Sequence, residues 1–178
     1  MIDLSHARTP PYAHQIIGVE RLVASPTFFL CDEMGAGKTK QVIDAAQVLF
    51  QRGDVDKVIV VAPASVRAVW FDPELGELAK HLWESVNATI MEFHARSRQW
   101  RWGAEQPPKD ARVLNWVVTN YEYTRNINLL DYLLKHWAGP KTLLVLDESS
   151  AVKNPSAKQT KACFKLRRAC NRVVLLNG

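Results

Sequence analysis

The sequence predicts a three-layer α/β fold in which helices flank a mostly parallel central sheet. Short apolar segments rich in β-branched residues alternate along the chain with longer segments of helical periodicity. The segments 57–62 and 142–146 are almost continuously hydrophobic, as expected for strands buried on both faces. A glycine-rich loop directly after the first predicted strand gives the fold the pattern of a P-loop protein.

The predicted elements alternate in order along the chain. We expect strands at 27–31, 57–62, 87–92, 113–119, 142–146 and 172–176, and helices at 12–24, 38–51, 65–81, 122–136 and 156–169. A helix between two strands lets the second strand lie parallel to the first. The polar segment 94–112 interrupts the alternation, and we expect it to be an inserted loop.

The loop at 32–39 reads Asp-Glu-Met-Gly-Ala-Gly-Lys-Thr and is predicted to bind the phosphates of a nucleotide. Its glycines allow backbone N–H groups to turn toward an anion. Its lysine supplies a positive charge for the β- and γ-phosphates, and its threonine a hydroxyl ligand for Mg²⁺. An ordinary glycine-rich turn before a helix is the alternative. The predicted nucleotide-binding residues are Gly35, Ala36, Gly37, Lys38 and Thr39.

Composition indicates a single globular domain. The chain has 178 residues, of which 47% are hydrophobic, and a net charge of +5. No apolar run approaches the roughly 20 residues that cross a bilayer, so we expect no membrane association and a cytoplasmic protein, nucleoid-associated or nuclear according to the cell. The three cysteines have no metal-ligand spacing and are expected to be reduced and mostly buried.

A second chemical pattern follows the strand predicted at 142–146. In an open α/β sheet, ligands collect at the carboxyl ends of the strands, so Asp147 and Glu148 should lie beside the phosphate loop. Asp147 is the candidate Mg²⁺ ligand, and Glu148 the candidate base for the water that attacks the γ-phosphate. Considered alone, the pair could equally be a helix cap or a solvated turn.

These motifs occur in order over nearly the whole chain, which resembles the first RecA-like lobe of a superfamily 2 helicase-type ATPase of the SWI/SNF-type branch. That branch normally carries Asp at the position of Asp32, which accounts for the departure from the general glycine pattern. Residues 11–15 and Gly18-Val19 resemble the segment whose glutamine recognises adenine. The resemblance therefore implies an adenine-recognition segment at 1–24 with Gln15 as its base-reading residue; an exposed glutamine at a helix start is the alternative.

The resemblance also implies contacts with nucleic acid. Residues 60–65 resemble motif Ia and residues 117–122 the segment around motif Ib, which touch the phosphate backbone in the family. Ser65 and Thr119 are the candidate hydroxyl donors. A helix cap is the alternative for Ser65, and we expect Trp70, which follows it, to be a core residue.

The stretch after the acidic pair also resembles this branch. Lys153 lies in it and begins a run of basic residues, extending to Arg172, that contains no Asp or Glu. Lys153 is the third candidate contact to nucleic acid, and a solvated helix face is the alternative for the run.

Two positions depart from the family pattern, and residues 1–178 include only the part of that pattern up to motif III. Ser150 occupies the place of a histidine, and Asn177 that of a threonine at the start of motif III. The family places a second RecA-like lobe, which supplies arginines to the γ-phosphate, after motif III. We therefore expect residues 1–178 to be one lobe of a larger motor that binds Mg-ATP but, lacking such arginines, turns it over roughly 10³-fold more slowly or worse.

The function implied by the resemblance is ATP-dependent translocation on double-stranded DNA, with Lys38 and Glu148 as catalytic residues and ATP and Mg²⁺ as cofactors. RNA stays open as the track, because backbone contacts carry no base readout. Two other functions remain open from the residues alone. The chain could be a complete small P-loop kinase or nucleotidase, or a nucleic-acid-binding module with a vestigial ATP site.

Overall fold

A seven-stranded sheet forms the centre of the computed structural model, which describes residues 2–93, 98–103 and 111–178. The strands lie in the order β1-β7-β6-β2-β5-β3-β4. The six strands β1, β7, β6, β2, β5 and β3 all run parallel to one another. Strand β4 pairs with β3 in the antiparallel direction. The strand bounds are β1 Thr27–Leu30, β2 Lys57–Ala62, β3 Ala88–Phe93, β4 Arg98–Gly103, β5 Leu114–Asn120, β6 Thr142–Leu146 and β7 Arg172–Leu176.

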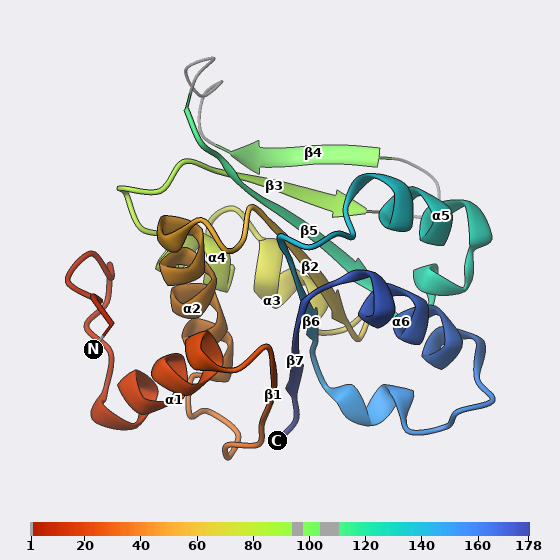
Figure 1. The fold of residues 1–178 in the computed structure, drawn as a ribbon, viewed down its shortest axis with the longest axis horizontal. Coiled ribbons are helices and arrows are strands. Elements are labelled where there is room, and N and C mark those ends of the chain that lie inside the picture. The colour runs from red at the N-terminus through yellow and green to blue at the C-terminus, as the bar shows by residue number, and fades with distance from the viewer. Residues whose placement is uncertain (1, 94–97, 104–110) are drawn as a thin grey trace.

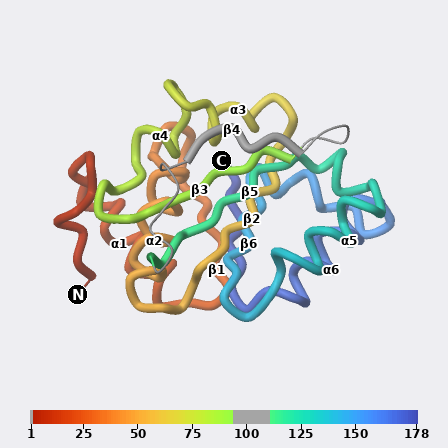
Figure 2. Tube along the Cα trace, turned by 90° about the horizontal axis from the view of Figure 1, so that it is seen from above, coloured from red at the N-terminus to blue at the C-terminus, as the bar shows by residue number. Residues whose placement is uncertain are grey.

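Helices cover both faces of this sheet, which confirms the predicted three-layer architecture. Figure 1 and Figure 2 show α1, α2 and α4 gathered on one side of the strands and α5 and α6 on the other. The helix bounds are α1 Ala13–Ala24, α2 Lys38–Arg52, α3 Arg67–Phe71, α4 Glu77–His81, α5 Ile127–His136 and α6 Lys158–Ala169, with short 3₁₀ helices η1 Tyr123–Arg125 and η2 Ser149–Val152.

Each face of the sheet has its own hydrophobic core, because side chains alternate between the two faces along every strand. In β2, Val58 and Val60 join the cluster under α1 to α4, whereas Ile59 and Val61 join the cluster under α5 and α6. The central strands are therefore buried on both faces, as their continuous hydrophobicity predicts. No helix among the described residues is long and apolar enough to span a membrane.

The six predicted strands are confirmed with bounds displaced by one residue at most, but the helix predicted at 65–81 is wrong. That segment forms two short helices, α3 and α4. The carboxylate of Asp72 ends α3 by accepting hydrogen bonds from the backbone N–H groups of Glu74 (2.9 Å) and Leu75 (2.8 Å). Pro73, between Asp72 and Glu74, has no N–H to continue the helix. Gly76 lies so close to Asp72 that a methyl group on Gly76 would be 2.5 Å from the Asp72 carbonyl oxygen.

Two other predictions need correction. The segment 122–136 is helix η1 followed by α5, because the Asn126 side chain accepts hydrogen bonds from the N–H groups of Asn128 and Leu129 and so starts a new helix. Within the loop predicted at 94–112, residues 98–103 form strand β4. Their sequence alternates polar residues with tryptophan, which favours strands, and the predicted loop overlooked this period of two. The parts at 94–97 and 104–110 lie outside the described residues.

Candidate nucleotide-binding site

The two predicted motifs lie at the same edge of the sheet, at the carboxyl ends of parallel strands. The phosphate loop follows β1 and the acidic pair follows β6, with only β7 between these strands. The end of β7 packs against the loop, since the N–H of Asn177 donates to the Leu30 carbonyl (3.2 Å) and a methyl group on Gly178 would lie 2.5 Å from Lys38 Nζ. This arrangement brings the residues of both motifs to one place, as predicted.

The phosphate loop has the backbone conformation that its glycines permit. Gly35 and Gly37 have φ values of +82° and +75°, in the left-handed region that other residues rarely adopt. Gly37 also occupies the N-cap position of α2 and provides no side-chain cap, so the first N–H groups of that helix are directed at the loop without a capping oxygen. The loop therefore offers backbone donors to an anion.

Lys38 lies in the first turn of α2 with its ammonium group over the loop. Its Nζ donates hydrogen bonds to the carbonyl oxygens of Asp32 (2.7 Å) and Glu33 (2.9 Å). Both acceptors are uncharged carbonyl oxygens. Phosphate oxygens are charged and can therefore take their place by accepting stronger hydrogen bonds from the ammonium group. Thr39 follows it and is half-buried.

The segment 1–24, predicted to recognise adenine, contacts the loop at 32–39 through Gln15. This side chain is only 5% exposed, so the alternative of an exposed glutamine is wrong. Its Oε1 accepts a hydrogen bond from the N–H of Tyr12 (3.0 Å), and its Nε2 donates to the carbonyl of Ala36 (3.2 Å). A methyl group on Gly37 would lie 2.3 Å from this Nε2, so the second glycine also makes room for Gln15. Recognition of adenine by Gln15 stays a prediction.

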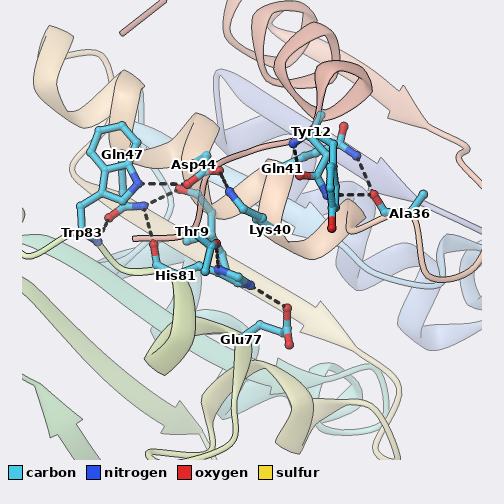
Figure 3. A network of polar contacts seen from close by, with 12 residues as sticks. Thr9, Tyr12, Ala36, Lys40, Gln41, Asp44, Gln47, Glu77, His81 and Trp83 are labelled. Carbon is cyan, nitrogen blue, oxygen red and sulfur yellow. Dashed lines mark hydrogen bonds and ion pairs between the residues drawn. The ribbon is translucent and has the colours of Figure 1, made fainter. Parts of the chain in front are cut away.

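Gln41 is a supporting residue that the sequence prediction missed. Its Nε2 donates to the carboxylate of Asp32 (3.1 Å) and to the carbonyl of Ala36 (3.4 Å), the latter drawn in Figure 3. Gly18 allows α1 to approach, since a methyl group there would lie 1.8 Å from Gln41 Oε1. The sequence carries no signal for this role, because it depends on the packing of α1 against α2.

A buried polar network holds α2 behind the loop (Figure 3). Lys40 forms an ion pair with Asp44, whose other carboxylate oxygen accepts from the indole N–H of Trp83 (3.0 Å). Gln47 accepts from the Trp83 backbone N–H and donates to the carbonyl of His81 in α4. Since these groups are buried and paired, they fix the position of the helix that carries the loop.

The acidic pair is held by distant residues. Asp147 is 7% exposed, and its Oδ2 accepts from the indole N–H of Trp70 (2.7 Å) while its Oδ1 accepts from the backbone N–H of Glu148 (3.0 Å). The Tyr121 hydroxyl donates to the Asp147 carbonyl (2.7 Å), and the Asp147 N–H donates to Val61 in β2 (2.9 Å). Trp70 is thus buried as expected, and it also bonds the acidic pair, which the sequence did not indicate.

Glu148 lies in a strained backbone conformation. Its φ of 48° and ψ of 56° make it the one residue other than glycine with positive φ among the described residues. Such a conformation costs about 1–2 kcal/mol and is typical of functional sites. Glu148 lies between β6 and η2, and it is half-buried there. Ser150, in the position of the family histidine, is exposed.

The electrostatics of Asp147 link the two motifs. Burial raises the pKa of this carboxyl above its usual value of 3.8, while the hydrogen bonds from Trp70 and Glu148 and the positive charge of Lys38 act in the opposite direction. Lys38 and Asp147 therefore lie within electrostatic reach of each other. Burial also raises the pKa of Tyr121.

The cysteines take no part in this site. Burial raises the pKa of the Cys163 thiol to about 12 and that of Cys170 to about 11. Cys31 is exposed, and all three are free thiols, so the expectation of reduced and mostly buried cysteines is confirmed.

The three candidate contacts to nucleic acid differ in position. Ser65 is exposed in the turn after β2, and its alternative role as a helix cap is wrong because Val66 is the N-cap of α3. Lys153 is also exposed. Thr119 is 0% exposed and donates to the carbonyl of Phe93 (3.4 Å), so the prediction that it contacts a phosphate is wrong. Its hydroxyl meets the neighbouring strand β3 through Phe93, which leaves it inside the fold.

Residues that could hold Mg²⁺ are present but few. Within the described part of the chain, no group of three or more His, Cys, Asp or Glu side chains could hold a metal ion. The hydroxyl of Thr39 and the carboxylate of Asp147 are oxygen ligands of the kind that Mg²⁺ prefers, and Mg²⁺ in such sites takes its other ligands from phosphates and water. The donor set therefore fits Mg²⁺ bound together with a nucleotide.

The fold is also found in solved structures of helicase-type motors. The structure of the Sulfolobus solfataricus SWI2/SNF2 ATPase core in complex with dsDNA superposes with a TM-score of 0.72 over 97% of this chain and 33% of that chain, at 23% sequence identity. UvsW helicase from bacteriophage T4 superposes with a TM-score of 0.59 over 96% of this chain and 53% of its own, at 14% identity. The fold is therefore that of a RecA-like helicase lobe, as the sequence predicts.

Sequence comparison defines the family more closely. The SNF2-related domain family matches residues 14–177, and the chain belongs to this family. It is 30% identical over 149 residues to the Xenopus tropicalis SWI/SNF-related matrix-associated actin-dependent regulator of chromatin subfamily A-like protein 1, and 32% identical over 145 residues to the Schizosaccharomyces pombe chromatin remodeling factor mit1. These alignments include 84% and 77% of this chain. They cover only 13% and 10% of the length of the two relatives.

Proposed function

We propose that this chain binds Mg-ATP between the loop at 32–39 and the acidic pair Asp147-Glu148. The observation that carries the proposal is topological: the loop with Lys38 follows β1 and the acidic pair follows β6, at the same edge of the sheet with only β7 between these strands. A positive charge for phosphates and a carboxylate for a metal ion are brought together by the fold rather than by sequence proximity.

The site residues have distinct roles in this proposal. Backbone N–H groups at Gly35, Ala36 and Gly37 bind the phosphates, and Lys38 exchanges its two carbonyl partners for β- and γ-phosphate oxygens. Thr39 and Asp147 hold Mg²⁺, which neutralises charge that develops on the phosphates. Gln15 reads the adenine base.

Glu148 orients a water molecule and accepts its proton as the water attacks the γ-phosphate. Its backbone strain is consistent with this role, because strained residues persist where the surrounding structure holds them for function.

At the level of the whole protein, we propose an ATP-dependent motor that moves on double-stranded DNA and is located with the DNA of the cell. Support comes from membership of the SNF2-related family and from the fold shared with an ATPase core solved with dsDNA. A second RecA-like lobe would complete the catalytic site. Ser65 and Lys153, both exposed, are the proposed backbone contacts, and RNA stays open as the track.

Titration calorimetry of this chain with Mg-ATP tests nucleotide binding, and Lys38→Ala is the informative variant. A charged hydrogen-bond donor contributes about 1.5–3 kcal/mol, so we expect the affinity to fall roughly 10- to 100-fold. Lys135→Ala is the matched control, since Lys135 is an exposed lysine in α5. Equal affinity of the wild type and Lys38→Ala, or no binding by the folded wild type, would contradict the proposal.

A further inference from the structure

Trp70 lies in α3, outside both motifs, but it contacts one of them directly. It is 0% exposed, and its indole Nε1 donates the 2.7 Å hydrogen bond to Asp147 Oδ2. The two residues are 77 positions apart in the sequence. We propose that Trp70 is a positioning residue that sets the orientation of the Asp147 carboxylate toward the metal ion; this inference rests on the proposed function.

The hydrogen bonds of Asp147 explain why the indole can set this orientation. Oδ1 accepts from the backbone N–H of Glu148, which is local and turns with the same loop. Oδ2 accepts from Trp70, which belongs to a different element. The carboxylate is therefore fixed at both oxygens, and the bond from Trp70 is the one that ties it to the body of the fold. Removal of a donor that hydrogen-bonds a metal-ligating side chain typically lowers metal affinity 10- to 100-fold.

Helix α3 is itself well anchored, so it can serve as a reference for the carboxylate. The N–H groups of Val66 and Arg67 both donate to the carbonyl of Pro63 (3.0 Å), which joins the helix to the turn after β2. Arg67 Nε lies 3.0 Å from the buried carboxylate of Glu92 in β3. Its guanidinium also lies over the rings of Phe71 and Tyr123, at 5.9 and 5.7 Å from their centroids. The indole is therefore carried by a helix that is bound both to the turn after β2 and to β3.

The chain provides a matched control for this hydrogen bond. Trp116 in β5 is also 0% exposed and packs in the same hydrophobic cluster as Trp70, but its indole N–H has no hydrogen-bond partner among the described residues. Trp70→Phe and Trp116→Phe both shrink a buried ring, and only the first removes a hydrogen bond. A general packing defect should affect the two variants alike.

The test compares the affinity for Mn-ATP with that for ATP in the presence of EDTA, measured by calorimetry on the wild type, Trp70→Phe and Trp116→Phe. Mn²⁺ replaces Mg²⁺ so that electron paramagnetic resonance can count bound metal in parallel. We expect Trp70→Phe to bind Mn-ATP about 10-fold more weakly with its metal-free ATP affinity unchanged. We expect Trp116→Phe to match the wild type in both. If Trp70→Phe does not fold, benzothienylalanine at position 70 keeps the ring size without the N–H and should give the same result.

The outcomes separate this inference from the proposed function. Unchanged Mn-ATP affinity in Trp70→Phe, or equal losses with and without metal, would overturn the positioning role while leaving the nucleotide site in place. A folded wild type that binds neither form of ATP would contradict the proposed function itself and this inference with it.

Discussion

The phosphate loop and the acidic pair lie at one edge of the sheet but are held in different ways. The phosphate loop is local: its shape comes from Gly35 and Gly37, and its lysine donates to carbonyls five and six residues away. The acidic pair depends on distant residues, with Trp70 and Tyr121 bonding Asp147 across 77 and 26 positions. The first motif is encoded by adjacent residues, and the second by the packing of the whole sheet.

The largest expected effect separates the chemistry of the two motifs. Glu148→Gln, tested in a protein that joins this chain to a second RecA-like lobe, should keep Mg-ATP binding, because the phosphate loop is unchanged. It should lose ATP turnover by roughly 10²- to 10⁴-fold, the usual contribution of a general base. Steady-state phosphate release measures turnover, and Lys135→Ala serves as a surface control. Hydrolysis at the wild-type rate would remove Glu148 from the catalytic role.

Alanine substitutions at the two glycines of the phosphate loop separate the cost of a strained backbone from the cost of a steric contact. Gly35→Ala forces a left-handed conformation on alanine, at a cost of about 1–2 kcal/mol, but the added methyl group meets nothing within 4 Å. Gly37→Ala adds a contact at 2.3 Å with Gln15 Nε2 to a similar strain. We expect Gly37→Ala to be the more destabilising in urea denaturation. Equal losses would show that Gln15 moves aside freely.

Tyr121→Phe tests the support of the acidic pair from β5. The substitution keeps the ring and removes only the hydroxyl that donates to the Asp147 carbonyl. Loss of one such buried bond costs about 1 kcal/mol, so the free energy of unfolding should fall by that amount. Tyr132→Phe, at a half-buried tyrosine of α5, is the comparison variant. A Tyr121→Phe protein as stable as the wild type would indicate that the strand ends alone hold the loop.

The smallest expected effect is a pH dependence that belongs to Asp147. Burial raises its pKa, so the folded state holds the proton more tightly than the unfolded state does. Its contribution to stability is full below the usual value of 3.8 and is lost as the pH rises through the folded pKa. In metal-free protein, the stability of the wild type relative to Asp147→Asn should therefore decline as the pH rises from that value toward neutrality. A difference that is independent of pH would contradict the shift.

The same contrast explains how much of the molecule the sequence predicts. The strands, the phosphate loop and the acidic pair are visible as continuous patterns, and the structure brings Lys38 and Asp147 together as expected. The role of Trp70 is invisible, because its hydrogen-bond partner lies in another element. The prediction for Thr119 is wrong for a related reason, because its hydroxyl donates to Phe93 in the neighbouring strand β3 and lies inside the fold.

The sequence also does not predict where helix α3 ends or which residues support the phosphate loop from other elements. The hydrophobic period continues past Asp72, but its side chain satisfies the N–H groups of the next residues and ends the helix. Gln41 is polar and lies on a helix with an apolar face, so its burial against Gly18 follows only from the packing of α1 on α2. Such contacts depend on which elements become neighbours, and this information is spread over the whole chain.

A crystal structure of this chain with Mg²⁺ and a non-hydrolysable ATP analogue tests most directly whether the two motifs form one site. We expect Lys38 Nζ to leave the carbonyls of Asp32 and Glu33 for phosphate oxygens, and the metal ion to lie between Thr39 and Asp147. A nucleotide bound elsewhere, or bound with Lys38 still on those carbonyls and the metal away from Asp147, would contradict the claim that the two motifs form one site.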